Sequence, residues 1–444
     1  MKNKFHMAAG GILLTVLVAC NLPFSGKPTA ISFPTVPFFP ATNTLTAPAH
    51  GQPSPTPNPF TPTLTPTATI TLNPLGIPPM AIGTSIDLTR INMLDAQNGW
   101  GIGGSHMSGN FGHIFRTMDG GTSWFEVTPP AVATSAAEAA SLGAVGFFST
   151  TDTAWVTYHF PDASKIPANP VVWKTTDGGR TWQPGSPLAT ADLEETYYVS
   201  DVFFATPSAG WVLAHVGAGM NHDYVALYRT SDGGATWSRV IDPYNDGGIQ
   251  GCTKTGLMFS DASNGWLTGD CNGVAPGALL FQTGDGGSSW NPIHLPAPIG
   301  HPDLFTAMQY ACGVRAPFVR GTQIYLGVEC MDMSTDPGTA IPYLYRGPVS
   351  GSNWSYLAYP GGDIFTLDGN RIWALGKNIY RSENGGYNWP QISTVTWDGR
   401  FDFVSSTLGF AIAMKEGGYS LVQTNDGGGL WSLLSPVVIA WPGT

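Results

Sequence analysis

A turn motif that recurs between Arg116 and Trp431 constrains the fold of this chain more than any other feature of its sequence. Its clearest form is Thr-x-Asp-Gly-Gly-x-Ser/Thr-Trp, in which the Asp carboxylate can accept backbone N–H groups and the glycines permit positive φ angles. The aspartates and tryptophans of the motif are Asp119, Asp177, Asp232, Asp285 and Asp426, with Trp124, Trp182, Trp237, Trp290, Trp389 and Trp431. One copy has Asn384 in place of Asp, and a degenerate copy ends at Trp354. Turns spaced in this way predict a repeat protein whose units pack side by side.

A weaker repeat precedes each turn and is typical of the first hairpin of a small antiparallel sheet. An apolar residue starts each copy, and an aromatic residue follows a short polar turn. The apolar anchors are Met93, Phe148, Phe204, Phe259, Phe318, Phe365 and Phe403. Seven anchors matched to seven turn positions predict seven four-stranded units. Because the sixth unit is compressed, six units plus a remnant is the alternative.

The turn motif resembles the Asp-box, or BNR, repeat of sialidase-like β-propellers, and the resemblance covers nearly all of residues 81–444. It implies an all-β propeller in which each motif lies between the third and fourth strands of a blade. It also implies a structural role for the Asp and Trp residues, far from any active site. The blade pattern is similar to that of photosystem II assembly-factor-like propellers, some of which are lipoproteins, and from this second likeness we carry over the fold alone. We expect either Val437 to Trp441 or the strand near Ser85 to Leu88 to close the ring.

Residues 1–20 are typical of a targeting signal. Lys2 and Lys4 precede an apolar run, from Ala8 to Ala19, that is too short to span a bilayer, and Cys20 follows it. The run and the cysteine resemble a bacterial lipobox. This resemblance implies lipidation of Cys20 and an exported protein, anchored by lipid to the outer face of the cell membrane or envelope. An ordinary secretory signal with an incidental cysteine is the alternative.

Residues 21–80 include stretches of Pro and Thr, from Pro53 to Pro59 and from Thr61 to Pro66, that cannot bury a core or pair as a central strand. We interpret them as an extended tether, and residues 81–444 as the propeller. The formal net charge of the chain is −11, without a basic stripe, which argues against binding to nucleic acid. We expect a monomer without a cofactor, whose contact with the membrane is through the lipid anchor.

Four cysteines remain when Cys20 is set aside, and they allow three pairings. Two fall at the same end of the fourth hairpin, and two repeat that placement in the fifth. We therefore predict two disulfides, in keeping with an oxidising exterior. The predicted pairs are Cys252–Cys271 and Cys312–Cys330. Metal binding is the competing interpretation, and no C-x-x-C or histidine spacing supports it.

The long and variable connections lie on one face of the predicted propeller, and binding sites concentrate on long loops carried by a rigid scaffold. Three residues before the anchors of four blades stand charged side chains: Arg90, Asp201, Arg315 and Arg400. We expect them at the mouth of the channel, where guanidinium groups could gather a carboxylate or another anion. The other ligand-binding candidates are Asp363, His159, His222 and Tyr224. The alternative is that the charged groups pair with neighbours around the rim.

Two hypotheses of function follow. The first is a surface-anchored, non-catalytic propeller that binds a protein or a glycan through the long-loop face. The second is an exo-sialidase or another glycoside hydrolase, in which Arg90, Arg315 and Arg400 would hold a sugar carboxylate. An inverting hydrolase would need two facing carboxylates, for which Asp201 and Asp363 are the candidates. Glutamates are scarce and no Tyr–Glu pair can be assigned, so we favour the first hypothesis.

Overall fold

The computed structural model describes residues 75–105, 111–130, 132–133, 135–163, 165–193, 196–219, 222–249, 251–271 and 275–441. The chain divides into two compact units, Met1–Thr69 and Ile70–Thr444, and every described residue belongs to the second. The predicted signal with Cys20, and the predicted tether up to residue 74, lie outside the described residues. Within the described part, no helix has the length and apolar character that a membrane crossing requires.

Short, mostly antiparallel strands build the described part of the second unit, together with one short helix there, α1 (Ala136–Ala139). The first strands of its repeating sheets are β1 (Asp87–Met93), β5 (Gly143–Phe148), β9 (Tyr198–Phe204), β13 (Thr253–Phe259), β17 (Tyr310–Val314) with β18 (Phe318–Arg320), β22 (Asp363–Thr366) and β26 (Asp398–Phe403). The second strands are β2 (Gly99–Gly104), β6 (Ala154–His159), β10 (Gly210–Ala218), β14 (Gly265–Asp270), β19 (Gln323–Asp332), β23 (Ile372–Leu375) and β27 (Gly409–Lys415).

The outer strands of the sheets follow the same order along the chain. The third strands are β3 (His113–Thr117), β7 (Trp173–Thr175), β11 (Asp223–Thr230), β15 (Leu279–Thr283), β20 (Thr339–Pro348), β24 (Asn378–Ser382) and β28 (Gly418–Thr424). The fourth strands are β4 (Ser123–Glu126), β8 (Gln183–Pro184), β12 (Ser238–Ile241), β16 (Asn291–Pro292), β21 (Ser355–Ala358), β25 (Gln391–Thr394) and β29 (Ser432–Leu433). The last strand is β30 (Val437–Ile439).

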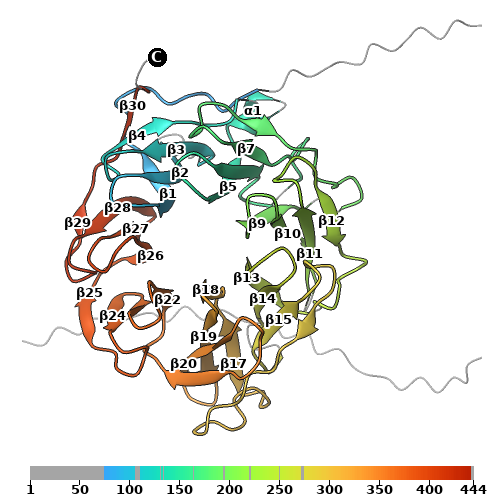
Figure 1. The fold of residues 1–444 in the computed structure, drawn as a ribbon, viewed down its shortest axis with the longest axis vertical. Coiled ribbons are helices and arrows are strands. Elements are labelled where there is room, and N and C mark those ends of the chain that lie inside the picture. The colour runs from blue at the N-terminus through green and yellow to red at the C-terminus, as the bar shows by residue number, and fades with distance from the viewer. Residues whose placement is uncertain are drawn as a thin grey trace, which may run out of the picture. The chain divides into compact units, whose positions relative to one another are not determined.

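The sheets stand around a ring, and the first strand of each lies toward its centre (Figure 1). Four sheets have four strands, one has five and one has nine. Aromatic rings pack between successive sheets. Trp155 stacks on Phe204 with a centroid distance of 3.8 Å, and Trp211 stacks on Phe259 at 3.5 Å. Each sheet buries its faces against its neighbours, so the unit is an all-β propeller and the predicted fold class is confirmed.

The nine-stranded sheet contains two successive antiparallel runs, β13–β16 and β17–β21, which are joined through a single residue pair. Asp270 at the end of β14 pairs with Gly313 in β17. A disulfide flanks this pair on each side and ties the first strand of its run to the second. Both disulfides join the predicted cysteines, Cys252–Cys271 and Cys312–Cys330.

The two ends of the propeller meet at β4. Strand β30 runs parallel to β4, with Val438 opposite Trp124. Ser85 forms an antiparallel bridge with Val437, and the Val438 N–H donates to Thr84 O at 2.9 Å. Both segments considered for closure therefore take part in it: the last strand pairs with β4 on one side and with the segment at Ser85 on the other.

The folded unit includes residues that precede the boundary predicted at Ala81. Leu75 forms an antiparallel bridge with Ala133, and Ile77 is buried in the core of the first two sheets. The Met80 N–H donates to the Glu126 carboxylate at 2.7 Å. The backbone of Leu75 and the side chains of Ile77 and Met80 thus hold this segment on the propeller, although its prolines resemble those of the tether.

Each turn motif joins the third strand of a sheet to the fourth. In the first copy, Asp119 Oδ1 accepts the N–H groups of Thr122 at 3.2 Å and Ser123 at 3.0 Å. Gly120 and Gly121 there have φ angles of 76° and 90°. The same acceptance of backbone N–H groups recurs at Asp177, Asp232, Asp285, Asn384 and Asp426. The polar atoms of the motif are therefore used within the turn.

In several sheets, a tryptophan of the second strand donates its indole N–H to the turn motif of the next sheet. The acceptor in each case is the carbonyl oxygen of the first glycine of that motif. The bonds run from the Nε1 of Trp155, Trp211 and Trp373 to the oxygens of Gly233 (2.8 Å), Gly286 (2.9 Å) and Gly427 (2.9 Å). Trp266 packs in one core cluster with Val349 of the degenerate turn, and its buried Nε1 has no hydrogen-bond partner among the described residues.

Candidate functional site

The first strands change register at the mouth, by which we mean their N-terminal ends on the face that carries the long loops. One extra residue enters the strand there, at Thr89 in β1, Ser200 in β9 and Thr255 in β13. A β-bulge of this kind interrupts the alternation of side chains and re-aims the residues beside it. In two of the strands, the next residue is one of the predicted site residues, Arg90 and Asp201.

Arg90 and Arg400 form a cationic pair in the mouth. Arg90 is half-buried, and its pKa is lowered first by burial and then by the positive charge of Arg400. Arg400 Nη1 donates a long hydrogen bond of 3.5 Å to Thr89 O, which places it beside the strand of Arg90. Two guanidinium groups that repel each other in this way favour an anionic ligand, and each can hold a carboxylate bidentately.

Asp201 supplies a carboxyl group next to this pair. Burial raises the pKa of Asp201, while the Ser200 hydroxyl and the charges of Arg90 and His215 lower it by less. The balance favours the neutral acid more than in an exposed aspartate. Asp201 therefore ionises less readily than an exposed aspartate would beside Arg90.

A row of rings lies beside Asp201. The rings of His159 and Tyr198 meet edge to face at 4.5 Å, and those of Tyr198 and His215 are 6.2 Å apart. His159 Nδ1 lies 3.1 Å from Phe160 O and donates to it, and burial lowers the pKa of His159. His159 is thus a neutral ring at physiological pH. His215 Nδ1 lies 2.8 Å from the Asp223 carboxylate.

Arg315 lies in the mouth with two carboxylates bound to it. Its Nη1 donates to Asp363 at 2.6 Å and its Nη2 to Glu329 at 3.0 Å. Glu329 also accepts the Tyr359 hydroxyl at 3.0 Å and the Gly362 N–H at 2.6 Å. Burial lowers the pKa of Arg315, but the two carboxylates raise it by more. Arg315 therefore pairs with neighbours on the rim, whereas the hydrolase hypothesis requires its guanidinium free for a sugar.

His222 and Tyr224 lie together in a different place. Their ring centroids are 5.9 Å apart, and both line a cavity of about 210 Å³ with Asp242 and Asp246. None of the predicted arginines lines this cavity. The structure therefore separates the predicted site residues into the arginine pair, the Arg315 ion pair and this small acidic cavity.

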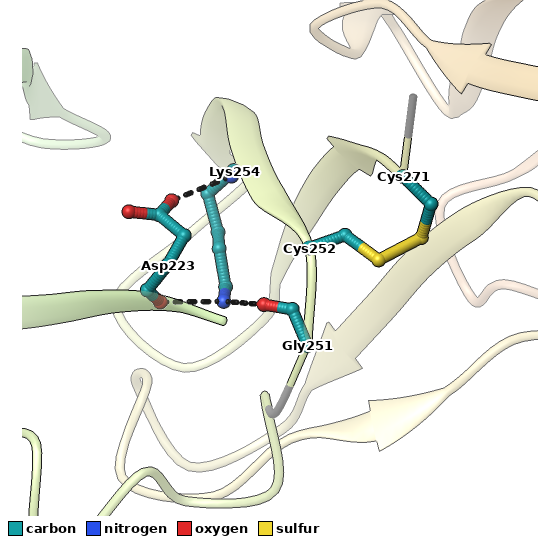
Figure 2. Close-up of a disulfide and its surroundings, with 5 residues drawn as sticks. All are labelled: Asp223, Gly251, Cys252, Lys254 and Cys271. Carbon is teal, nitrogen blue, oxygen red and sulfur yellow. Dashed lines mark hydrogen bonds between the residues drawn. A yellow bond between two sulfur atoms is a disulfide. The ribbon is translucent and has the colours of Figure 1, made fainter. Parts of the chain in front are cut away.

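A buried lysine connects the small cavity to the first disulfide and to the row of rings. Lys254 Nζ donates to Asp223 O at 2.9 Å and to Gly251 O at 2.6 Å, and its N–H donates to the Asp223 carboxylate at 2.8 Å (Figure 2). Burial lowers the pKa of Lys254 to about 8. Because Asp223 also binds His215, the start of β13 is tied to the mouth through hydrogen bonds.

Four residues that the sequence did not single out complete the mouth. Two belong to the row of rings and two to the Arg315 ion pair: Tyr198, His215, Glu329 and Tyr359. The position of Glu329 beside a predicted disulfide cysteine was a usable signal. Tyr198 and His215 are end residues of two of the long connections predicted from the sequence, Thr190 to Tyr198 and His215 to Tyr224. In the described part of the chain, no group of three or more His, Cys, Asp and Glu residues could hold a metal ion.

The fold is a β-propeller. Its long-loop face carries a pair of arginines, Arg90 and Arg400, and separately an arginine bound by two carboxylates, Arg315. No family model matches the chain. A curated relative, the photosystem II assembly lipoprotein Ycf48 of Synechococcus sp. (strain CC9902), is 28% identical over 271 residues, covering 56% of this chain and 73% of that protein.

Similar solved structures are propellers of low sequence identity. A structure of YCF48 bound to D1 peptide has a TM-score of 0.47 and 15% identity, and the match covers 78% of this chain and 94% of that chain. A GH74 xyloglucanase from Xanthomonas campestris has a TM-score of 0.44 and 13% identity, with 81% of this chain and 54% of that chain covered.

Proposed function

We propose that this chain is a non-catalytic propeller of seven blades that binds a segment of a partner protein across its mouth. The single observation that carries the proposal is the Arg90–Arg400 pair: Arg400 donates to Thr89 O beside Arg90, and burial, then the positive charge of Arg400, lowers the pKa of Arg90. A carboxylate of the partner relieves that repulsion and satisfies the guanidinium donors. The bound segment is therefore acidic, or presents a free C-terminal carboxylate, where it meets these arginines.

The sequence relative supports a protein as the partner. That relative is an assembly lipoprotein of photosystem II, and a role in assembly is consistent with a protein ligand. The targeting signal and Cys20 agree with a lipoprotein, and we propose that a lipid anchor holds this chain at the outer face of a bacterial cell membrane. A glycan ligand is the second choice at this mouth.

Binding of short synthetic peptides, measured by fluorescence anisotropy at two salt concentrations, tests the proposal. We expect an acidic peptide to bind more tightly than its Glu→Gln counterpart, and Arg400→Gln to raise its Kd by about tenfold. Arg180→Gln, in the exposed turn that joins β7 to β8 at the opposite end of the strands, is the matched charge control and should leave the Kd unchanged. Equal binding of the acidic and neutral peptides would contradict the proposal.

Activity assays on the same purified protein test the hydrolase hypothesis. Arg315 is engaged by Glu329 and Asp363, so we expect no turnover of a fluorogenic sialoside or of an oligosaccharide panel. Turnover that Asp201→Asn abolishes would replace the binding proposal with the glycoside hydrolase hypothesis.

A further inference from the structure

A groove lies where the two disulfide-bonded hairpins meet, on the side of the mouth that carries Arg315. Its volume is about 660 Å³, and its lining includes Asp270, Glu329, Asp363, Arg315, Met331 and Met333. It has room for several side chains of a peptide. Neither Arg90 nor Arg400 lines it, so it is distinct from the cationic pair.

The charge of the groove is negative. Three carboxylates line it against one guanidinium. Burial raises the pKa of Glu329, but hydrogen bonds from Arg315 and from the Gly362 N–H outweigh it and lower the pKa below its usual value. Glu329 is therefore ionised at neutral pH. The Asp363 side chain is 56% exposed and can meet a second cation while it holds Arg315.

Methionine side chains form the outer edge of the groove. Met331 and Met333, which line it, are 38% and 62% exposed, and Met308, outside the lining, is 63% exposed. The Met333 N–H donates to Gln309 O at 2.8 Å, which brings the strand after Met308 beside Met333. Unbranched thioether side chains adapt to apolar partners of varied shape, and they recur at peptide-binding surfaces for that reason.

The walls of the groove are rigid. The Asp270–Gly313 pair joins them at the base, and a disulfide crosslinks the hairpin on each side of that pair. One of these disulfides includes Cys330, which itself lines the groove. A site that is already ordered loses little conformational entropy when a ligand binds.

We infer that this groove binds a basic, apolar peptide segment, with a Lys or Arg side chain against Asp363 and Glu329 and an apolar side chain against Met331 and Met333. The inference rests on the proposed function and makes it more specific. The partner segment carries a basic residue as well as a carboxylate, and the two meet opposite charges on one face. Because the Arg90–Arg400 pair and the acidic groove lie at different places on this face, the segment binds in one direction only.

Anisotropy titrations of the oxidised protein with three labelled peptides test the inference. One alternates Lys with Leu and Met, one replaces Lys by Gln, and one replaces Lys by Glu. We expect the Lys peptide to bind at least about tenfold more tightly than the Gln peptide at low salt. Asp363→Asn should raise the Kd of the Lys peptide by about threefold to fivefold, and Met333→Ser by a similar factor. Both positions are exposed, so neither variant should disturb folding.

Arg400→Gln separates this inference from the proposed function. It should leave the Lys peptide unaffected and weaken the Glu peptide. If it weakens neither while Asp363→Asn weakens the Lys peptide, the groove stands and the proposed function fails. Equal binding of the Lys and Gln peptides, or an unchanged Kd in Asp363→Asn, would overturn the groove. Self-association in sedimentation velocity that Met333→Ser abolishes would also overturn it, because the occupant would then be a second copy.

Discussion

At the scale of single residues, Arg315 is held at the mouth by the carboxylates of Glu329 and Asp363. The repeat placed Arg315 at the mouth because the interval to its blade anchor is the same as in other blades. Glu329 and Asp363, which bind it, come from the next strand of the sheet and from the first strand of the following sheet. Pairings across strands and between sheets depend on register and bulges, which side-chain spacing does not encode.

Asp402 gives a prediction at this scale. It accepts the Met93 N–H at 2.6 Å, and burial raises its pKa to about 6 from an ordinary value of 3.8. Between these pH values the folded state binds more protons than the unfolded state, so this group's contribution to stability falls as the pH rises. The isosteric variant Asp402→Asn keeps an acceptor without a charge. We expect its free energy of unfolding, relative to the wild type, to increase by about 1–3 kcal/mol between pH 4 and pH 7.

Urea unfolding followed by tryptophan fluorescence at the two pH values measures this difference. Asp398→Asn is the control, because Asp398 starts the same strand and is exposed. A relative stability of Asp402→Asn that does not change with pH would contradict the assignment of a raised pKa.

At the scale of elements, the sequence was most informative about turns and least informative about what joins one sheet to the next. Thr-x-Asp-Gly-Gly identifies a turn because the carboxylate and the glycines act within a few residues of each other. The bond from Trp211 to Gly286 O links two repeats, and its donor and acceptor are 75 residues apart in the chain. The degenerate turn at Val349 was visible in the sequence, but the unpartnered indole of Trp266 was not.

Two tryptophans form a matched pair for measuring the free energy that this hydrogen bond between sheets contributes to stability. Trp211 and Trp266 are both completely buried in second strands, and the indole of Trp211 alone has an acceptor. Phe at either position removes similar volume, so the cost of the smaller ring cancels in the comparison. We expect Trp211→Phe to destabilise the protein by about 1–2 kcal/mol more than Trp266→Phe, the net value of a buried hydrogen bond. Equal losses in urea unfolding would show that the indole N–H contributes nothing.

At the scale of the whole molecule, ring closure is the property that the sequence left open. Two segments were candidates for the closing strand, one at each end of the propeller, and nothing in their composition excluded either. The structure uses both, because β30 pairs with β4 on one side while Ser85 bridges to Val437 on the other. Closure joins residues more than 300 positions apart, and local propensity carries no information at that distance.

Truncation after Pro436 tests closure. It removes Val438, which is 3% exposed, together with its backbone bonds to Thr84 and Gly83. We expect the free energy of unfolding to fall by about 3 kcal/mol or more, from one buried valine and two hydrogen bonds. Truncation after Trp441 keeps β30 and is the control. Unfolding midpoints that agree between the two truncations would mean that the ring is held closed elsewhere.

The seam at β4 also sets how the propeller carries mechanical load. Residues 75–86 run into the fold through the Leu75–Ala133 bridge, the Met80–Glu126 bond and then the bridge from Ser85 to Val437. Tension on the chain ahead of Leu75 reaches the seam only after it has broken the first two of these connections. The segment therefore protects the closure of the ring. A force applied on the N-terminal side first breaks the Leu75–Ala133 and Met80–Glu126 contacts, and only then acts on the Ser85–Val437 bridge.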